Sequence, residues 1–248
     1  MTALQACLAI LFISACVWAQ DKTARAVNFN NQGVAQMKSE NYLAAIESFN
    51  RAIDVESNYA TAHYNLGTAY VAARQLNNAA AALQRAIELY PGYGEAFNQL
   101  GVVYLESGEI EKAVKVLKQA VWLKNTDAVA FYNLGCAFIR RQKFGEAIES
   151  LENAKLLDEE NLEIRLNLGF AYGRQKRYAE AIAEMQKAVR LNQTDEQAQM
   201  LLCGFYMAAN DKESALAQYA KIKQQNPPLA RKLLGEIYKD KIVAVSQK

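Results

Sequence analysis

The sequence predicts an all-α solenoid, a stack of six helix pairs closed by one further helix at the C-terminal end. Small residues recur every 34 positions, and apolar residues with helical spacing accompany each of them. Prolines and glycines number only 3 and 12 among 248 residues, which disfavours a sheet-and-turn architecture. The recurring small residues are Gly33, Gly67, Gly101, Gly135, Gly169 and Cys203.

Other positions repeat in the same register. If the recurring small residue is numbered position 8, the six repeats begin at residues 26, 60, 94, 128, 162 and 196. From the second repeat on, position 7 is leucine and position 11 is aromatic. Position 20 is alanine throughout, at Ala45, Ala79, Ala113, Ala147, Ala181 and Ala215.

These spacings predict two helices in each repeat. Positions 4, 7, 8 and 11 form one stripe of a helix, and positions 20, 24 and 27 form a stripe on a second helix. The small residues at positions 8 and 20 allow the two backbones to approach closely. One pair of short helices cannot bury both stripes by itself, so neighbouring repeats must stack.

The pattern resembles the tetratricopeptide repeat (TPR) family. Tyr64–Tyr70 and Tyr132–Phe138 read like the family consensus, and Pro91 stands at its late proline position. The similarity covers residues 26–229. It implies a right-handed superhelical solenoid whose concave groove receives a peptide or a segment of a partner protein. We expect a capping helix over residues 229–241 and a tail over residues 242–248.

The N-terminal segment predicts export. Residues 1–20 contain no charged side chain, and the apolar run Ala6–Ala19 is shorter than the roughly 20 residues of a membrane-spanning helix. We interpret residues 1–19 as a signal peptide and residues 20–25 as a linker, with a periplasmic or secreted mature protein. Ile13–Cys16 also resembles a bacterial lipobox, in which Cys16 carries a lipid. An uncleaved membrane anchor is the third reading.

One face of the first helices carries candidate binding residues. It comprises positions 2, 5, 6, 9, 12 and 13, and we call it the candidate face. Position 6 supplies a column of amides, which resembles the asparagine ladder of the peptide-binding TPR superhelix in O-GlcNAc transferase. A side-chain amide can donate to and accept from a peptide backbone at once. The alternative is that these amides bond within the stack. They are Asn31, Asn65, Gln99, Asn133 and Asn167.

Apolar and basic side chains flank the amides. Tyr64, Tyr132, Val102 and Phe170 would form the floor of a groove for an extended segment or a helix. Alternatively, they pack neighbouring first helices against one another. Arg140 and Arg174, at position 13, would select an acidic segment or a terminal carboxylate. The alternative is that they stay solvated and offset the helix dipole.

No motif predicts catalysis, a metal site or a cofactor. His63 falls at a packing position, Cys136 and Cys203 are expected to be free, and carboxylates such as Glu152 and Glu159 are expected on solvated surfaces. A formal charge of +2 argues against a general nucleic-acid binder.

The sequence therefore favours an exported scaffold for protein–protein interaction over an enzyme. Two alternatives remain open. One is a lipid-anchored assembly factor of the cell envelope, similar to the pilotins that escort secretins. The other is a structural subunit that associates with its own copies.

Overall fold

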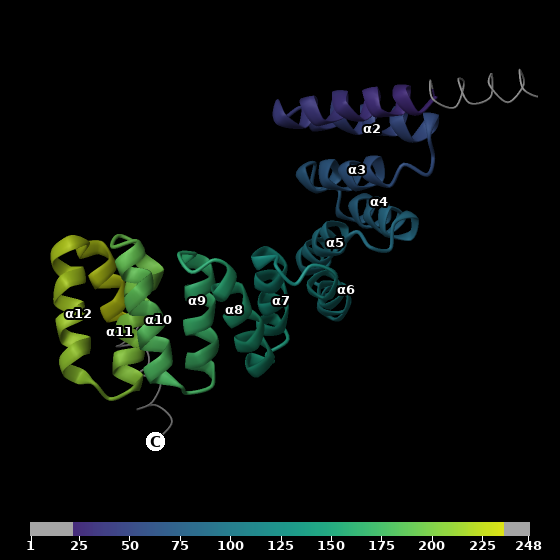
Figure 1. Ribbon diagram of the computed structural model, residues 1–248. Coiled ribbons are helices and arrows are strands. Elements are labelled where there is room, and N and C mark those ends of the chain that lie inside the picture. Colours follow the sequence, from purple (N-terminus) through teal and green to yellow (C-terminus); the bar gives the residue numbers. More distant parts are fainter. Residues whose placement is uncertain (1–21, 236–248) are drawn as a thin grey trace, which may run out of the picture. The chain divides into compact units, whose positions relative to one another are not determined.

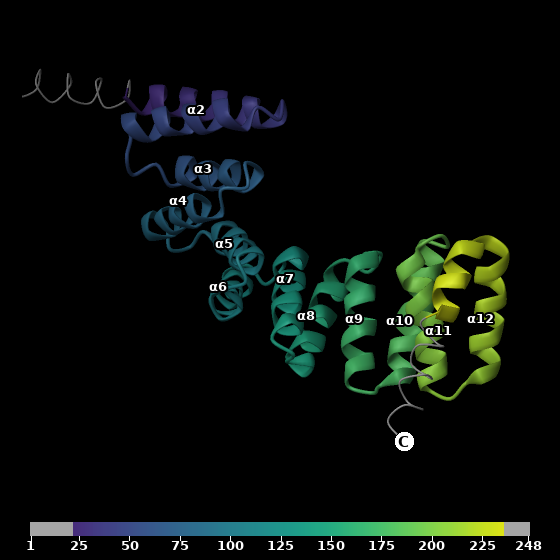
Figure 2. The same cartoon turned by 180° about the vertical axis from the view of Figure 1, so that it is seen from behind.

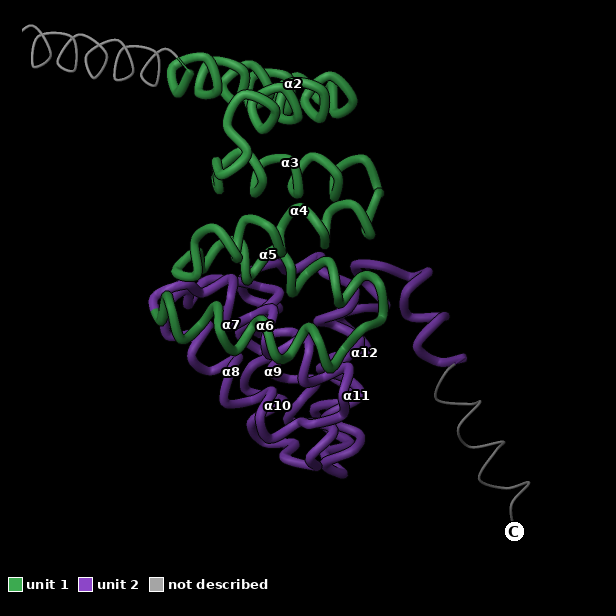
Figure 3. Tube along the Cα trace, turned by 90° about the vertical axis from the view of Figure 1, so that its right-hand side faces the viewer, with its two compact units in different colours: residues 1–125 green, residues 126–248 purple. Residues whose placement is uncertain are grey.

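The computed structural model describes residues 22–235, which are helical apart from short turns. The chain divides into two compact units, Met1–Asn125 and Thr126–Lys248 (Figure 3). No strand occurs among residues 22–235, so the predicted all-α fold of stacked helix pairs is confirmed. The expected signal peptide, the alternative lipid site at Cys16 and the tail from residue 242 lie outside the described residues.

The first unit begins with a helix over residues 22–38, which already includes residues 22–25, where we expected a linker. Consecutive helices of this unit pack against each other, and α3 also contacts α5. No helix within residues 22–235 combines the length and apolar character needed to cross a membrane. The labelled helices of the unit are α2 (Tyr42–Val55), α3 (Ala60–Ala72), α4 (Leu76–Leu89), α5 (Gly94–Glu106) and α6 (Ile110–Leu123).

The second unit repeats this order, and its helices lie side by side in alternating directions (Figures 1 and 2). A last helix over residues 227–235 starts two residues before the expected Leu229. Its Leu229 and Leu233 are buried against Cys203 and Ile222 of the sixth repeat. The labelled helices are α7 (Ala128–Arg140), α8 (Phe144–Leu157), α9 (Leu162–Arg174), α10 (Tyr178–Leu191), α11 (Glu196–Ala208) and α12 (Lys212–Gln225).

The recurring small residue is the point at which the two helices of a pair meet. A Cβ placed on Gly135 would lie 2.5 Å from Leu151 Cγ, and one on Gly101 would lie 2.4 Å from Leu117 Cγ. Leu117 and Leu151 are fully buried. Position 8 of the first helix therefore touches the side chain at position 24 of the second helix, and any side chain larger than hydrogen must displace it.

A left-handed residue turns the chain from the first helix into the second. It occupies position 15 in every repeat, and only Gly108, with φ 77°, is a glycine. The amide of the next residue donates to the carbonyl at position 11, as Glu109 does to Tyr104 at 2.8 Å. This is the hydrogen bond of a Schellman C-cap. The other five residues are Glu40, Arg74, Gln142, Lys176 and Asn210.

We expect Gly135→Ala to lower the free energy of unfolding by about 1–2 kcal/mol, because overpacking at Leu151 outweighs the better helix propensity of alanine. Gly204 provides the matched control, because a Cβ at this helical glycine would meet nothing within 4 Å. Gly204→Ala should raise the free energy of unfolding by about 0.5–1 kcal/mol. Urea unfolding followed by circular dichroism measures both. A stabilised Gly135→Ala variant would contradict the contact.

Candidate functional site

In the first unit, the side-chain amides at position 6 differ in the hydrogen bonds that they form. Asn65 Nδ2 donates to Oδ1 of the buried Asn30 at 2.8 Å. Its Oδ1 accepts no hydrogen bond from the described residues. Gln99 is half-buried and forms no hydrogen bond to any residue in the described part of the chain, and Asn31 is exposed. One of these three amides is thus bonded within the stack, and it keeps an acceptor.

An aromatic cluster lies beside these amides. The rings of Tyr64 and Tyr93 are 4.9 Å apart between centroids, and Tyr90 lies 5.7 Å from Tyr93. Burial is the main cause that raises the pKa of Tyr64, and it raises the pKa of Tyr93 to about 12. Val102 is half-buried on the same candidate face. The first unit therefore presents neutral phenols and apolar surface next to amide groups that still have atoms free to form hydrogen bonds.

In the second unit, Asn167 uses its amide nitrogen twice. Nδ2 donates to the Glu163 carbonyl at 2.9 Å and approaches the Tyr132 hydroxyl at 3.4 Å. Burial is the largest cause that raises the pKa values of Tyr132 and of the neighbouring Cys136 thiol. Asn133 is half-buried and has polar contacts of its own. As at Asn65, the amide at position 6 bonds the side chain at position 5 of the preceding repeat.

The two arginines at position 13 lie in different surroundings. The Arg174 guanidinium stacks over the Phe144 ring at 4.7 Å and lies 5.8 Å from the Phe170 ring. Those two rings meet edge to face at 6.3 Å. Arg140 is exposed and has an interaction partner. Phe170 therefore takes part in an aromatic–guanidinium stack rather than standing alone on the candidate face.

Position 4 has a role that the sequence did not reveal. Where it is polar, its side chain reaches the backbone carbonyl at position 32 of the preceding repeat. His63 Nε2 lies 3.0 Å from the Ser57 carbonyl, so His63 is not simply a packing residue. Arg165 Nη2 donates to the Glu159 carbonyl at 2.5 Å. Gln199 Nε2 donates to the carbonyl of Gln193.

Arg165 is also the centre of a buried ionic network, which we did not expect. Its side chain is only 3% exposed, and Nη1 donates to Glu184 Oε2 at 2.8 Å. Lys155 lies 3.0 Å from Glu184 Oε1 and 2.6 Å from Glu152 Oε2.

The network extends in both directions from this core. Glu152 accepts a hydrogen bond from the Tyr172 hydroxyl at 2.7 Å, and Glu159 lies 3.7 Å from Arg165. Glu159 is exposed, as expected, although it lies near the buried Arg165. The expectation that Glu152 is merely solvated is wrong, because it is half-buried and bonds both Lys155 and Tyr172. Nε of Arg165 has no hydrogen-bond partner among the described residues.

The described residues contain no cluster of three or more histidine, cysteine or acidic side chains that could hold a metal ion. Cys136 and Cys203 are free thiols. The chemistry on the candidate face is therefore that of amides, phenols and guanidinium groups, which recognise polar and aromatic groups through hydrogen bonds and stacking.

Helix pairs with these recurring contacts define a helical-repeat protein. A family described as "Tetratricopeptide repeat protein 21 C-terminal ARM domain" matches residues 13–197, and a family described as "Tetratricopeptide repeat" matches residues 173–237. The first match covers more than half of the chain, so this protein belongs to the tetratricopeptide repeat family, whose repeats are scaffolds for protein–protein interaction. A search of curated proteins finds no match.

Solved structures share the fold at low sequence identity. PilF of Pseudomonas aeruginosa is 16% identical with a TM-score of 0.72, over 87% of this chain and 99% of that chain. YrrB, described as a TPR protein with an unusual peptide-binding site, is 20% identical with a TM-score of 0.63, over 75% and 94%. MamA of Desulfovibrio magneticus is 23% identical with a TM-score of 0.64, over 69% and 97%. At these identities the similarity shows the fold alone.

The network around Arg165 leads to a prediction about stability. We expect Glu184→Gln to lower the free energy of unfolding by about 3 kcal/mol, because it leaves the buried Arg165 without its closest carboxylate, whereas Lys155 keeps Glu152. The double variant Arg165→Gln/Glu184→Gln should lose less stability, and its loss should be smaller than that of Glu184→Gln by about 1 kcal/mol or more.

The physical reason for that difference is that the double variant also removes the buried charge that the single variant leaves unpaired. Glutamine at residue 165 can still donate to the Glu159 carbonyl, as Gln199 does to Gln193. A double-mutant cycle by urea unfolding measures the coupling between the two side chains. If the losses of the two single variants simply add in the double variant, Arg165 and Glu184 are not coupled.

Proposed function

We propose that this protein is an exported adaptor that binds an extended segment of a partner protein along the candidate face. The observation that carries the proposal is that amide groups at position 6 have hydrogen-bonding atoms without partners among the described residues. Gln99 forms no hydrogen bond to the described residues, and Oδ1 of Asn65 and Oδ1 of Asn167 accept none. Polar groups that are half-buried and unpaired gain from a ligand that supplies the missing bonds.

Geometry on the helix supports this surface as the binding face. Position 6 lies about 160° around the helix from position 8, the contact point with the second helix. The amides are therefore not needed to hold the helix pair together. A peptide backbone offers an N–H and a C=O at every residue, and an amide can engage both without reading the side chain.

The neighbouring side chains support an extended polypeptide as the ligand. Tyr64, Tyr132, Val102 and Phe170 are all partly exposed, so they offer apolar surface without being open patches. Arg140, exposed at the end of α7, would add attraction for an acidic segment. YrrB, which shares the fold, is described as having a peptide-binding site of an unusual kind.

Export rests on the sequence of the first twenty residues, which have the apolar run and polarity switch of a signal peptide. The alternative function is a lipid-anchored assembly factor of the cell envelope, for which the Ile13–Cys16 lipobox is the specific observation. Both forms would use the same repeats, and they differ in how the N-terminal end is processed.

The first prediction from this proposal concerns Gln99. A peptide ligand would be selected by displaying a random peptide library against the full chain, and its affinity measured by fluorescence anisotropy. Gln99→Ala should weaken this affinity about tenfold, because two hydrogen bonds to the peptide backbone are lost. The thermal unfolding midpoint should not fall, because Gln99 has no hydrogen bond within the described structure to lose.

Gln119→Ala is the matched control. Gln119 is an exposed glutamine on α6 that likewise has no hydrogen bond to the described residues, and it lies on a second helix, away from the candidate face. Its replacement should leave the affinity unchanged. Equal affinities for the Gln99→Ala and Gln119→Ala proteins would rule out ligand contact at Gln99.

A second prediction separates the two modes of export. In the native host, intact-mass spectrometry of the mature protein should show an unmodified N-terminus at Gln20, because cleavage after Ala19 removes residues 1–19. A mature chain that begins at a lipid-modified Cys16 would instead establish the anchored form. An N-terminus at Met1 would contradict both.

A further inference from the structure

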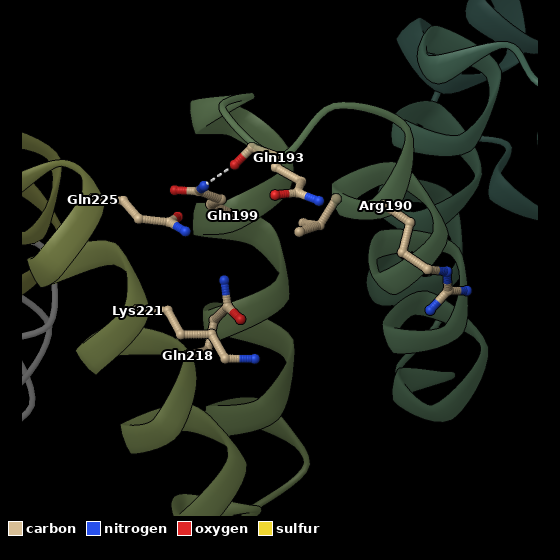
Figure 4. A pocket seen from close by; sticks show the side chains of 7 residues that line it. Arg190, Gln193, Gln199, Gln218, Lys221 and Gln225 are labelled. Carbon is tan, nitrogen blue, oxygen red and sulfur yellow. Dashed lines mark hydrogen bonds between the residues drawn. The ribbon is translucent and has the colours of Figure 1, made fainter.

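A polar pocket opens in the second unit between α10, α11 and α12 (Figure 4). Its volume is about 380 Å³, within the range of pockets that hold small ligands. A smaller cavity that shares three of its residues adds Thr194 and Asn226 to the wall. None of the lining residues belongs to the candidate face. They are Val189, Arg190, Gln193, Gln199, Gln218, Lys221 and Gln225.

The same place in the preceding repeat is occupied by the protein's own charges. There the lining residues are Glu159, Glu160, Arg165, Lys187, Arg190 and Leu191, at equivalent or adjacent repeat positions. Arg165 is paired with the buried Glu184, and Lys187 lies 4.0 Å from Glu159 Oε1. In the fifth repeat, then, the carboxylates that the cations need are supplied from within the chain.

One repeat later the carboxylates are gone. Gln193 stands at the position of Glu159, Gln199 at that of Arg165, and Gln218 at that of Glu184. The cation of Lys187 is kept as Lys221. The lining of this pocket therefore holds two cations, Arg190 and Lys221, and no acidic side chain.

Gln218 is the second observation that points to a ligand. The residue is only 8% exposed, yet its amide forms no hydrogen bond to any described residue. Figure 4 shows this amide beside the Lys221 side chain, on the wall of the pocket. Lys221 and Gln225 also have no partner within the described part of the chain. The protein does not enclose the atoms of this amide, so they open onto the pocket, where a ligand can bond them.

We propose that this pocket binds a carboxylate carried by a peptide, as either a free C-terminus or an acidic side chain. Lys221 supplies the opposite charge, and the amides of Gln218 and Gln225 supply neutral donors to the carboxylate oxygens. Oε1 of Gln199, whose amide nitrogen is held by Gln193, is available to accept a peptide N–H. The carboxylate takes the place that Glu184 and Glu159 hold one repeat earlier.

The lining favours a carboxylate over a phosphate. Tight phosphate sites use forked arginine donors or several backbone N–H groups. Here the one arginine, Arg190, points away from the glutamines (Figure 4). A single lysine with carboxamides suits a carboxylate, which carries one negative charge. The carboxamide oxygens can accept from the N–H groups of the peptide that carries it.

The test is a nuclear magnetic resonance titration of the full chain, following the side-chain amide signals of Gln218 and Gln225, assigned from their loss in variants. Three short glycine–serine peptides serve as probes. One has a free C-terminus, one is amidated with an internal glutamate, and one is amidated and uncharged. The first two should shift both signals with a Kd on the order of 1 mM. The stronger of them identifies the source of the carboxylate.

Two variants and a control test the chemistry. Gln218→Glu copies the carboxylate of the fifth repeat and should weaken the binding of the charged peptides about tenfold, with the Gln225 signal as the readout. Lys221→Gln, at an exposed residue that is safe for folding, should weaken it to a similar extent. Lys223→Gln makes the same change of charge on the same helix outside the pocket lining, so it should leave binding unchanged.

Several results would overturn the proposal. The uncharged peptide could shift the signals as much as the charged ones. In the same titration with small anions, inorganic phosphate could bind more tightly than acetate. Unchanged binding by the Lys221→Gln protein, or no shift with any peptide up to about 10 mM, would do the same. The Gln99→Ala protein should bind these probes with unchanged affinity. The proposal for this pocket and the proposal for the candidate face are therefore tested independently.

Discussion

The close contact between position 8 and position 24 is the constraint on which the rest of the architecture depends. With only hydrogen at position 8, the two helices of a pair approach until Phe49, Leu83, Leu117, Leu151 or Met185 lies on the backbone of the first helix. Each of these five side chains has no measurable exposure. The approach is similar in these five pairs, whereas the sixth pair has Cys203 at position 8. Recurrent contacts at other positions are possible only because of this regularity.

Hydrogen bonds that recur at a fixed offset demonstrate this dependence. The hydroxyl of an aromatic residue at position 11 meets the side chain twenty residues earlier on the preceding second helix. Gln84 donates to Tyr104 at 2.7 Å, and Gln186 donates to Tyr206 at 2.8 Å. In the same geometry Tyr172 donates to Glu152. The scaffold therefore provides equivalent places in successive repeats, and the local sequence decides which chemistry fills them.

The helices and their pairing could be predicted from the sequence because both depend on short-range spacing. Glycine at position 8, alanine at position 20 and a large side chain at position 24 lie within one repeat, and their meaning does not depend on distant residues. The left-handed turn at position 15 was harder to predict, since Gly108 is the only glycine there. At Arg74 or Lys176 the hydrogen bond from the next residue to position 11 holds a conformation that the residue itself does not favour.

The state of the candidate face could not be predicted, because the side chains that Asn65 and Asn167 contact lie on another repeat. Asn65 and Gln99 share position 6 and look equivalent in the sequence. Asn65 bonds to Asn30 and Asn167 approaches the Tyr132 hydroxyl, whereas Gln99 makes no such bond to Tyr64, which is also a tyrosine at position 5. Likewise, the register places Arg165 on the packing stripe, but nothing near it in the sequence identifies its partners. Its cost is offset by Glu184 nineteen residues away and by a carbonyl of the previous repeat.

Comparison of equivalent positions would have revealed more than any single stretch of sequence. Position 4 is phenylalanine in the third and fourth repeats, where Phe97 and Phe131 cannot bond a carbonyl, and it is polar at His63, Arg165 and Gln199. A polar side chain placed on an otherwise apolar stripe must find a partner, and in the structure all three find the carbonyl at position 32. The last two differ in charge but make the same bond, so the scaffold accepts either. Charge at this place is therefore free to vary from repeat to repeat without disturbing the contact between positions 8 and 24, and that independence allows one stack of helices to present surfaces of different chemistry.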